Sequence, residues 1–271
     1  MLKIRIITGA LLCIMGVLIL LLSHIPWFLG AVIACFCAQS IFELYRTTGA
    51  GKNKALYYTS CIAAVVLAFL DIPQYGVIVC VAFIAAVALF SYLMLNVKQL
   101  SNVSQGMSIG VAAMMVCFYK TMANIREGEQ GLYMLAIAIL VCIITDIAAY
   151  CVGKGIGRHP LAPTVSPQKT IEGSVGGILF AVAGGVLIAC ILESAGLVSV
   201  YYGKLALYLL FASVIGQFGD LSLSSVKRIC GVKDYGALLP GHGGLLDRFD
   251  SLLFVLPFTY LFTLCAGPVF L

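Results

Sequence analysis

Charged side chains are scarce in this sequence. Only 10% of its 271 residues are Asp, Glu, Lys or Arg, whereas 62% are hydrophobic, and the mean hydropathy is +1.09. A soluble domain covers its surface with charge, and about 25% of the residues of a typical globular protein are charged. The scarcity therefore excludes a soluble globular domain and indicates a protein that spans the membrane several times.

Two kinds of motif are also missing. The 11 cysteines include no Cys-x-x-Cys pair, and most of them lie within long apolar stretches. They are therefore expected to be free apolar thiols rather than zinc ligands or disulfides. The chain has no internal repeat with a period of about 20 to 50 residues, which argues against a repeat fold.

Long apolar stretches are abundant. Nine of them approach the roughly 20 residues that span a bilayer as a helix. They cover residues 5–23, 26–45, 55–70, 75–96, 107–123, 131–152, 173–193, 204–226 and 250–269. The sequence predicts an all-α, polytopic membrane protein with about nine transmembrane helices. The third and fourth stretches are separated by residues 71–74 alone, so a re-entrant pair is the alternative there.

Basic residues are unevenly distributed among the polar links. If every stretch crosses the membrane, Lys120, Arg126 and Lys204 face one side, and the other 13 of the 16 lysines and arginines face the opposite side. Cytoplasmic loops retain such residues, so the N-terminus is predicted to be cytoplasmic and the protein to be a multi-pass protein of the plasma (inner) membrane. The net charge of +5 follows from this bias and the anionic inner leaflet, and no nucleic-acid partner is expected.

Polar residues suggest two functional regions. Residues 1–105 are predicted to form a transmembrane scaffold that faces lipid, and residues 106–271 a catalytic region. The cytoplasmic loops of the catalytic region are expected at 153–172 and 227–249. In the first region Glu43 is a carboxylate within an apolar stretch, and Arg46 follows it at i+3. A local ion pair between these two side chains is expected.

The sixth stretch and the loop after it carry polar groups. Asp146 lies deep in the stretch with Tyr150 one turn later. An ionisable group at membrane depth is costly and thus a functional candidate, unless a basic residue of a neighbouring helix pairs with it. Loop 153–172 combines glycines with Lys169 and other cations, which suits a phosphate chain, although a plain connector can have the same composition. The glycines that follow, Gly173, Gly176, Gly177, Gly184 and Gly185, favour either a ligand site or close helix packing.

The eighth stretch carries an ordered set of polar side chains. Asp220, Ser224 and Lys227 stand at i, i+4 and i+7, which places a carboxylate, a hydroxyl and an ammonium along one side of a helix. Arg228 follows directly. Such a row can bind a metal ion through the carboxylate and phosphate oxygens through the cations.

The ninth helix is expected to begin with two carboxylates. Asp247 and Asp250 stand at i and i+3, where acidic groups suit the helix dipole and one of them could be an N-cap. Together with Asp220 they would form the oxygen-rich cage that Mg²⁺ prefers. Gly243 and Gly244, next to His242, leave the backbone free to approach a ligand closely.

These residues match the pattern of a known family. From residue 224 to residue 250 the chain reads S-x-V-K-R-x4-K-D-x-G-x2-L-P-x-H-G-G-L-x-D-R-F-D. This resembles the signature of the phosphatidate cytidylyltransferases, or CDP-diacylglycerol synthases, of the bacterial type. The upstream segment SPQKTIEG agrees as well, with a departure from the family pattern at Gln168 and Ile171.

The resemblance implies the transfer of CMP from CTP to phosphatidic acid, giving CDP-diacylglycerol and pyrophosphate. It also implies a site at the cytoplasmic face of the lipid bilayer, metal-assisted in-line transfer with one or two Mg²⁺ ions, and a homodimer. Two alternatives remain open at this point. A CTP-dependent polyprenol or dolichol kinase would transfer the γ-phosphate instead, and a secondary transporter would use the acidic residues as coupling sites.

The expected roles fall into three groups. The metal ligands are expected to be Asp220 and Asp247, with Asp250 and Asp146 as further ligands. The catalytic group, which would bind phosphates or orient other charges, comprises Lys227, Arg228, Lys233, Asp234, His242 and Arg248. The substrate-binding group comprises Lys169, Ser166, Thr170, Glu172, Ser224, Gly243, Gly244 and Tyr150.

Overall fold

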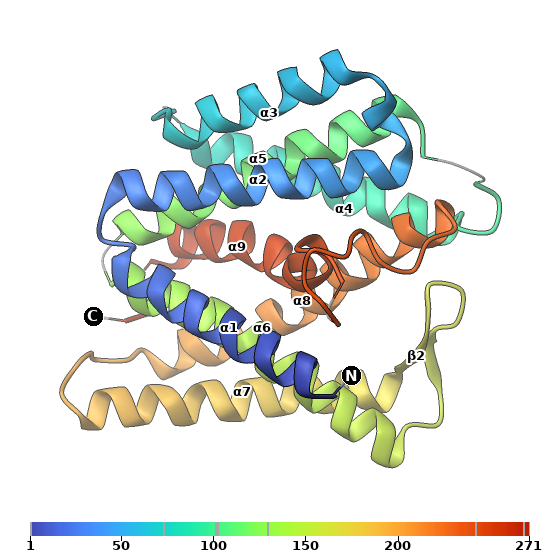
Figure 1. Cartoon of the computed structure of the whole chain (residues 1–271). Coiled ribbons are helices and arrows are strands. Elements are labelled where there is room, and N and C mark those ends of the chain that lie inside the picture. Colours follow the sequence, from blue (N-terminus) through green and yellow to red (C-terminus); the bar gives the residue numbers. More distant parts are fainter. Residues whose placement is uncertain are drawn as a thin grey trace. The chain divides into compact units, whose positions relative to one another are not determined.

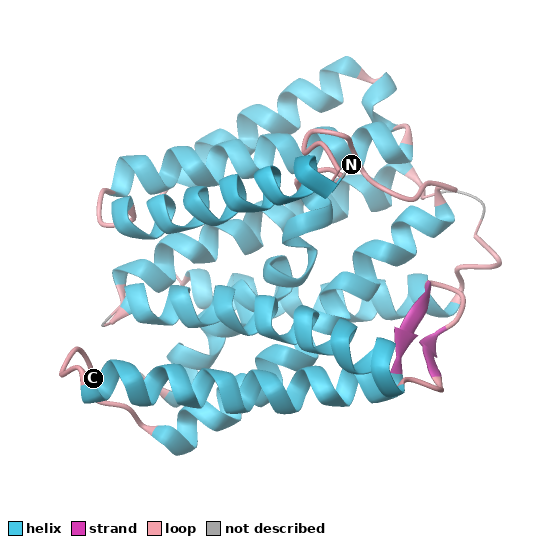
Figure 2. Cartoon of the chain, turned by 60° about the horizontal axis from the view of Figure 1, so that its bottom comes forward, coloured by secondary structure: helices cyan, strands magenta, loops and turns pink. Residues whose placement is uncertain are grey.

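The computed structural model describes residues 2–72, 74–100, 103–128, 130–241, 243–267 and 269–270, with side chains described from residue 8 onward. The described residues form nine α-helices, one short 3-10 helix and one hairpin (Figures 1 and 2). The α-helices are α1 (Leu2–Leu22), α2 (Pro26–Thr48), α3 (Lys54–Phe69), α4 (Tyr75–Leu95), α5 (Gln105–Glu127), α6 (Gly131–Ile156), α7 (Ile171–Ser194), α8 (Tyr202–Ile229) and α9 (Leu246–Ala266). The 3-10 helix η1 spans Ala50–Lys52, and the hairpin pairs β1 (Pro160–Ala162) with β2 (Ser166–Thr170) in antiparallel orientation.

Each of the nine predicted stretches is a helix. Among the described residues, seven helices are long and apolar enough to cross a membrane: α2, α4, α5, α6, α7, α8 and α9. The helix α3 has 16 residues, which at 1.5 Å per residue is shorter than the hydrocarbon core of a bilayer. The prediction of an all-α, polytopic membrane protein is therefore confirmed.

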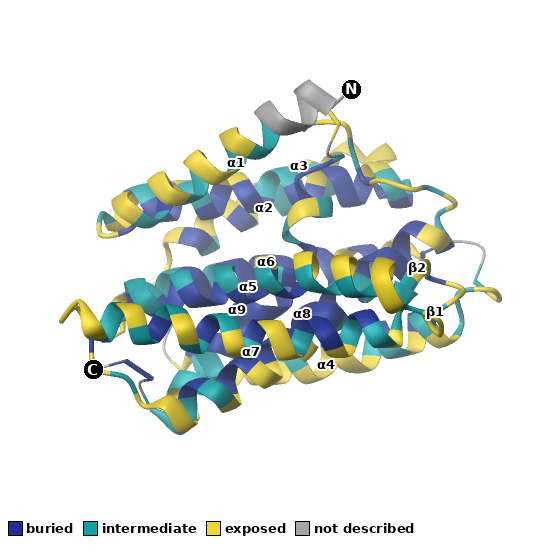
Figure 3. Cartoon of the chain, turned by 90° about the horizontal axis from the view of Figure 1, so that it is seen from below, coloured by how far each residue is buried: buried dark blue, intermediate teal, exposed yellow. Residues whose placement is uncertain are grey.

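The membrane helices expose large apolar side chains. On α7, Leu179, Leu187 and Ile191 are about 60% exposed, and Figure 3 shows exposed residues along much of this helix. In water such a surface would favour aggregation, whereas in a bilayer it contacts lipid tails. The exposed apolar faces therefore support the membrane assignment independently of hydropathy.

The chain packs into two compact units, and each is described by itself. The first unit comprises residues 1–123 and 225–250, and the second comprises residues 124–224 and 251–271. The first unit thus contains α1 to α4, most of α5, the last residues of α8 and the first turn of α9. The predicted functional division between residues 105 and 106 concerns roles rather than packing, and it stays a prediction.

Glycines of α7 pack against α6 within the second unit. A Cβ atom at Gly177 would lie 2.9 Å from the backbone oxygen of Thr145 and 3.1 Å from the Cβ of Ala149. Gly173 and Gly176 meet α6 in the same manner. Contacts this short leave no room for a side chain, so the close-packing interpretation of these glycines is supported.

Replacing Gly177 with alanine is expected to destabilise the second unit. The added methyl group would force α6 and α7 apart, at a cost of about 1–3 kcal/mol. Gly155→Ala is the matched control, because Gly155 lies on α6 with no atom within 4 Å of a Cβ placed there. Both substitutions share the gain in helix propensity, so the difference between their thermal unfolding midpoints in detergent isolates the packing effect. Equal midpoints would contradict it.

Candidate functional site

Lys227 and Asp247 form a buried ion pair in the first unit. The Nζ of Lys227, near the end of α8, lies 2.8 Å from Oδ1 of Asp247, in the first turn of α9. Their side chains are 10% and 4% exposed. The other carboxylate oxygen, Oδ2, accepts hydrogen bonds from the backbone N–H groups of Tyr235 at 2.8 Å and Gly244 at 2.9 Å. We call these four residues the Lys227–Asp247 cluster.

The side chain of Tyr235 also contributes to this cluster. Its ring is buried, and the Nζ of Lys227 lies 5.4 Å from the ring centroid, within the range of a cation–π contact. Burial, together with the acidic groups of Cys230, Asp247 and Asp250, raises the pKa of the Tyr235 phenol well above its usual range. The ring is therefore neutral at physiological pH. Sequence reasoning missed Tyr235 because the signature leaves this position open.

The other site residues predicted in the first unit lie close to the cluster in the sequence. Arg228, Lys233, Asp234 and Arg248 are exposed, whereas Asp250 is buried. The first unit thus carries one buried ammonium and three exposed cations on a segment of 22 residues, 227–248. Exposed cations in such density can bind a polyanion such as a phosphate chain. His242 lies outside the described residues.

Glu43 is not paired with Arg46, and this expectation from the sequence is wrong. The Glu43 carboxylate is 1% exposed and accepts hydrogen bonds from the backbone N–H groups of Leu245 at 2.9 Å and Leu246 at 2.8 Å. Arg46 is exposed, and the contacts described for Glu43 include none with it. The physical reason is that the first N–H groups of α9 have no partner inside their own helix and attract an anion more strongly than an exposed cation does.

The second unit holds a second ion pair. The Nζ of Lys169, on β2, contacts Oδ2 of Asp220 on α8, and the Ser224 hydroxyl donates to Oδ1 of Asp220 at 3.2 Å. These ionic side chains are 29% and 22% exposed, so this pair is more open than the Lys227–Asp247 cluster. Lys169, Ser224 and Asp220 were assigned to a site from the sequence, and the structure brings the three together.

The hairpin that carries Lys169 is fixed by two residues predicted to bind substrate. Glu172 accepts hydrogen bonds through Oε2 from the backbone N–H groups of Arg158 and His159 at 3.1 and 3.2 Å, and its Oε1 lies 2.6 Å from Nδ1 of His159. The Thr170 hydroxyl caps α7 by accepting from the N–H of Gly173 at 3.1 Å. In the structure, Glu172 and Thr170 therefore shape the loop.

Three other predicted residues lie elsewhere in the second unit. Asp146 and Tyr150 are exposed on α6, and the Nζ of Lys154 lies 5.8 Å from the Tyr150 ring centroid. Ser166 begins β2 and is half-buried. The structure describes no group of three or more His, Cys, Asp or Glu side chains that could hold a metal ion. The metal ligands therefore stay a prediction.

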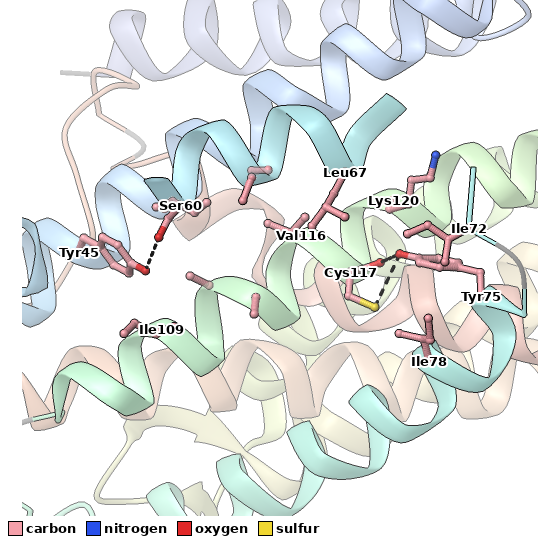
Figure 4. Close-up of a pocket in the computed structure, with 15 residues that line it drawn as sticks. Tyr45, Ser60, Leu67, Ile72, Tyr75, Ile78, Ile109, Val116, Cys117 and Lys120 are labelled. Atoms are coloured by element: carbon pink, nitrogen blue, oxygen red, sulfur yellow. Dashed lines mark hydrogen bonds between the residues drawn. The ribbon is translucent and has the colours of Figure 1, made fainter. Parts of the chain in front are cut away.

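A cavity in the first unit has a different character. It has a volume of about 420 Å³, lies among α2, α3, α4 and α5, and has mainly apolar walls (Figure 4). Tyr75 donates a hydrogen bond to the backbone oxygen of Cys117 at 2.6 Å, and the hydroxyls of Tyr45 and Ser60 lie 3.0 Å apart. Among the described residues that line it, Lys120 alone is charged. The charged clusters, rather than this cavity, are therefore the candidates for a polyanionic ligand.

In a polytopic helical membrane protein, ammonium–carboxylate pairs and exposed cations suit a protein of the class that handles phosphate-bearing substrates at a membrane. Comparison with known proteins makes the class specific. A model of the cytidylyltransferase family matches residues 3–266, and the chain belongs to this family.

Relatives support this assignment along nearly the whole chain. Phosphatidate cytidylyltransferase of Bacillus subtilis (strain 168) is 35% identical over 268 residues, which is 95% of this chain and 96% of the relative. The protein of the same name from Staphylococcus aureus (strain COL) is 33% identical over 260 residues, which is 94% of this chain and 96% of the relative. The resemblance inferred from the signature is thus confirmed.

Proposed function

We propose that this protein transfers CMP from CTP to phosphatidic acid, releasing pyrophosphate and leaving CDP-diacylglycerol in the membrane. Family membership and the names of the relatives support the reaction class. The observation that carries the proposal is the buried Lys227–Asp247 pair beside the exposed cations Arg228, Lys233 and Arg248. A fixed ammonium next to further cations is what a reaction between two polyanions requires.

The chemistry needs charge neutralisation more than it needs a base. A phosphate monoester has a second pKa of about 6, so the phosphatidate oxygen is already largely ionised near neutral pH. That oxygen attacks the α-phosphorus of CTP, a new P–O bond forms, and the bond to the departing pyrophosphate breaks. Asp247 orients the Lys227 ammonium, and the exposed cations bind the triphosphate and the leaving pyrophosphate. Positioning and electrostatic stabilisation supply most of the catalysis in such transfers.

Mg²⁺ is part of the proposal as a group that the residues could hold. Carboxylate oxygens are the ligands it prefers. The described residues bring no three such side chains together, so the proposed ligands, Asp220 and Asp247 with Asp250 and Asp146 as further ligands, rest on the sequence. When bound, Mg²⁺ would neutralise charge on the phosphates. Lys169, held against Asp220, would contribute a further cation.

The membrane orientation completes the proposal. The excess of Lys and Arg on one set of loops favours a cytoplasmic N-terminus in the plasma membrane and a cytoplasm-facing site, where soluble CTP can meet a lipid phosphate. The homodimer rests on the resemblance alone. Cross-linking of the protein in membranes would check it.

Labelled CTP tests the reaction directly. We expect purified protein in detergent, given phosphatidic acid and Mg²⁺, to place the label of α-³²P-CTP in a lipid and the label of γ-³²P-CTP in pyrophosphate. Omission of phosphatidic acid is the control and should abolish lipid labelling. A lipid that carries the γ label would instead identify a CTP-dependent lipid kinase and overturn the proposal.

A further inference from the structure

Glu43 is a buried carboxylate that contacts the signature segment directly. Glu43 lies on α2, in the region that the sequence predicted to be scaffold. Its carboxylate accepts hydrogen bonds from the N–H groups of Leu245 and Leu246, which are 202 and 203 residues further along the chain. The third contact described for it is the amide of Gln39, which donates at 2.9 Å. An unpaired buried carboxylate is costly, but the backbone N–H groups and the positive end of the α9 dipole offset that cost.

The signature glycines explain how the carboxylate fits. A Cβ atom at Gly236 would lie 2.9 Å from Oε1 of Glu43, and one at Gly244 would overlap the carboxylate. The sequence suggested that the glycines near His242 leave room for a ligand. For Gly244, and for Gly236 earlier in the loop, the structure shows that the space is taken by the side chain of Glu43.

Two carboxylates share three consecutive backbone donors at this helix start. The N–H of Gly244 donates a hydrogen bond to Asp247, and the N–H groups of Leu245 and Leu246 donate hydrogen bonds to Glu43. Leu245 has no side-chain oxygen with which to cap α9, so Glu43 supplies the cap from another helix. Asp247 follows directly and faces Lys227 across 2.8 Å. Any shift of this turn would therefore move Asp247 against Lys227.

We propose that Glu43 is a positioning residue for the reaction: it caps α9 from α2 and thereby holds Asp247 against Lys227. The expected change in kcat rests on the proposed function, whereas the expected structural role of Glu43 does not. It also gives the N-terminal region a part in the site, since α2 sets the geometry of a segment more than 200 residues further along the chain.

The experiment compares Glu43→Gln with Arg46→Gln, an exposed position three residues along the same helix. Glutamine keeps the size of the side chain but loses the charge and offers one oxygen to the two N–H groups. We expect Glu43→Gln to lower kcat by about 10- to 100-fold with the KM for CTP changed less than threefold, as a small misplacement of a catalytic group does. Glu43→Asp should recover part of kcat, and Arg46→Gln should behave as the wild type.

Amide hydrogen exchange distinguishes a failure of this proposal from a failure of the proposed function. Amide hydrogen exchange of residues 243–249 should accelerate in Glu43→Gln and not in Arg46→Gln, whatever reaction the protein catalyses. A kcat per folded molecule equal to that of the wild type in both Glu43→Gln and Glu43→Asp would overturn the proposal, and so would unchanged exchange. A wild-type protein that forms no CDP-lipid would contradict the proposed function alone, because the exchange result does not depend on turnover.

Discussion

Asp247→Asn is expected to lower the rate of CDP-lipid formation by about two to three orders of magnitude, the range found when a preorganised polar group is removed from an active site. The three groups described around the Asp247 carboxylate are all donors: the Lys227 ammonium and the N–H groups of Tyr235 and Gly244. The asparagine amide would turn its own NH₂ toward one of them. The substitution therefore loses a hydrogen bond and the charge that orients Lys227.

The measurement is the initial rate of transfer of the α-³²P label to lipid, normalised to folded protein by size-exclusion chromatography. Asp71→Asn is the control, because Asp71 is an exposed carboxylate between α3 and α4. Asp220→Asn should also lower the rate strongly, since Asp220 contacts Lys169 and Ser224. Near-normal activity of Asp247→Asn would remove Asp247 from the catalytic machinery.

The helices could be predicted from the sequence because hydropathy alone decides where a chain can cross a membrane. Hydropathy does not predict the residues at which the helices begin and end. The ninth apolar stretch was drawn from residue 250, whereas α9 begins at Leu246. Hydropathy excludes the charged Asp247, and only the i, i+3 spacing of Asp247 and Asp250 placed the helix start near it. The acceptor that the first N–H groups of α9 find, Glu43, could not be read from the sequence. The hairpin β1–β2 was missed because strands of three and five residues leave no readable alternation.

The candidate site could be predicted to the extent that its residues lie close together in the chain. The spacing of Asp220, Ser224 and Lys227 and the signature that follows placed three charged residues of the two ion pairs at a site, and the upstream segment SPQKTIEG placed the fourth, Lys169. Glu43 was missed because local spacing offered Arg46 as a partner, and no local rule reveals a contact across 202 residues. Thr170 and Glu172 were expected at the substrate, whereas their described contacts cap α7 and fix the β1–β2 hairpin.

Lys227→Met and Lys169→Met are expected to differ in stability although both should lower activity by about 100-fold. Removal of Lys227 leaves the carboxylate of Asp247, which is 4% exposed, without its counter-ion. Breaking a buried pair in this way costs about 3–5 kcal/mol. The partner of Lys169 is Asp220, whose side chain is 22% exposed and can be solvated. Lys169→Met should therefore lower the free energy of unfolding by about 1 kcal/mol or less.

Thermal unfolding midpoints in detergent check this difference, with Lys54→Met, at an exposed position at the start of α3, as the control. The double variant Lys227→Met/Asp247→Asn makes the test sharper. It removes both charges, so it should regain much of the stability lost in Lys227→Met, while its activity stays as low as that of either single variant. If the double variant were no more stable than Lys227→Met, the lost stability would come from the packing of Lys227 against Tyr235 rather than from the buried charge of Asp247.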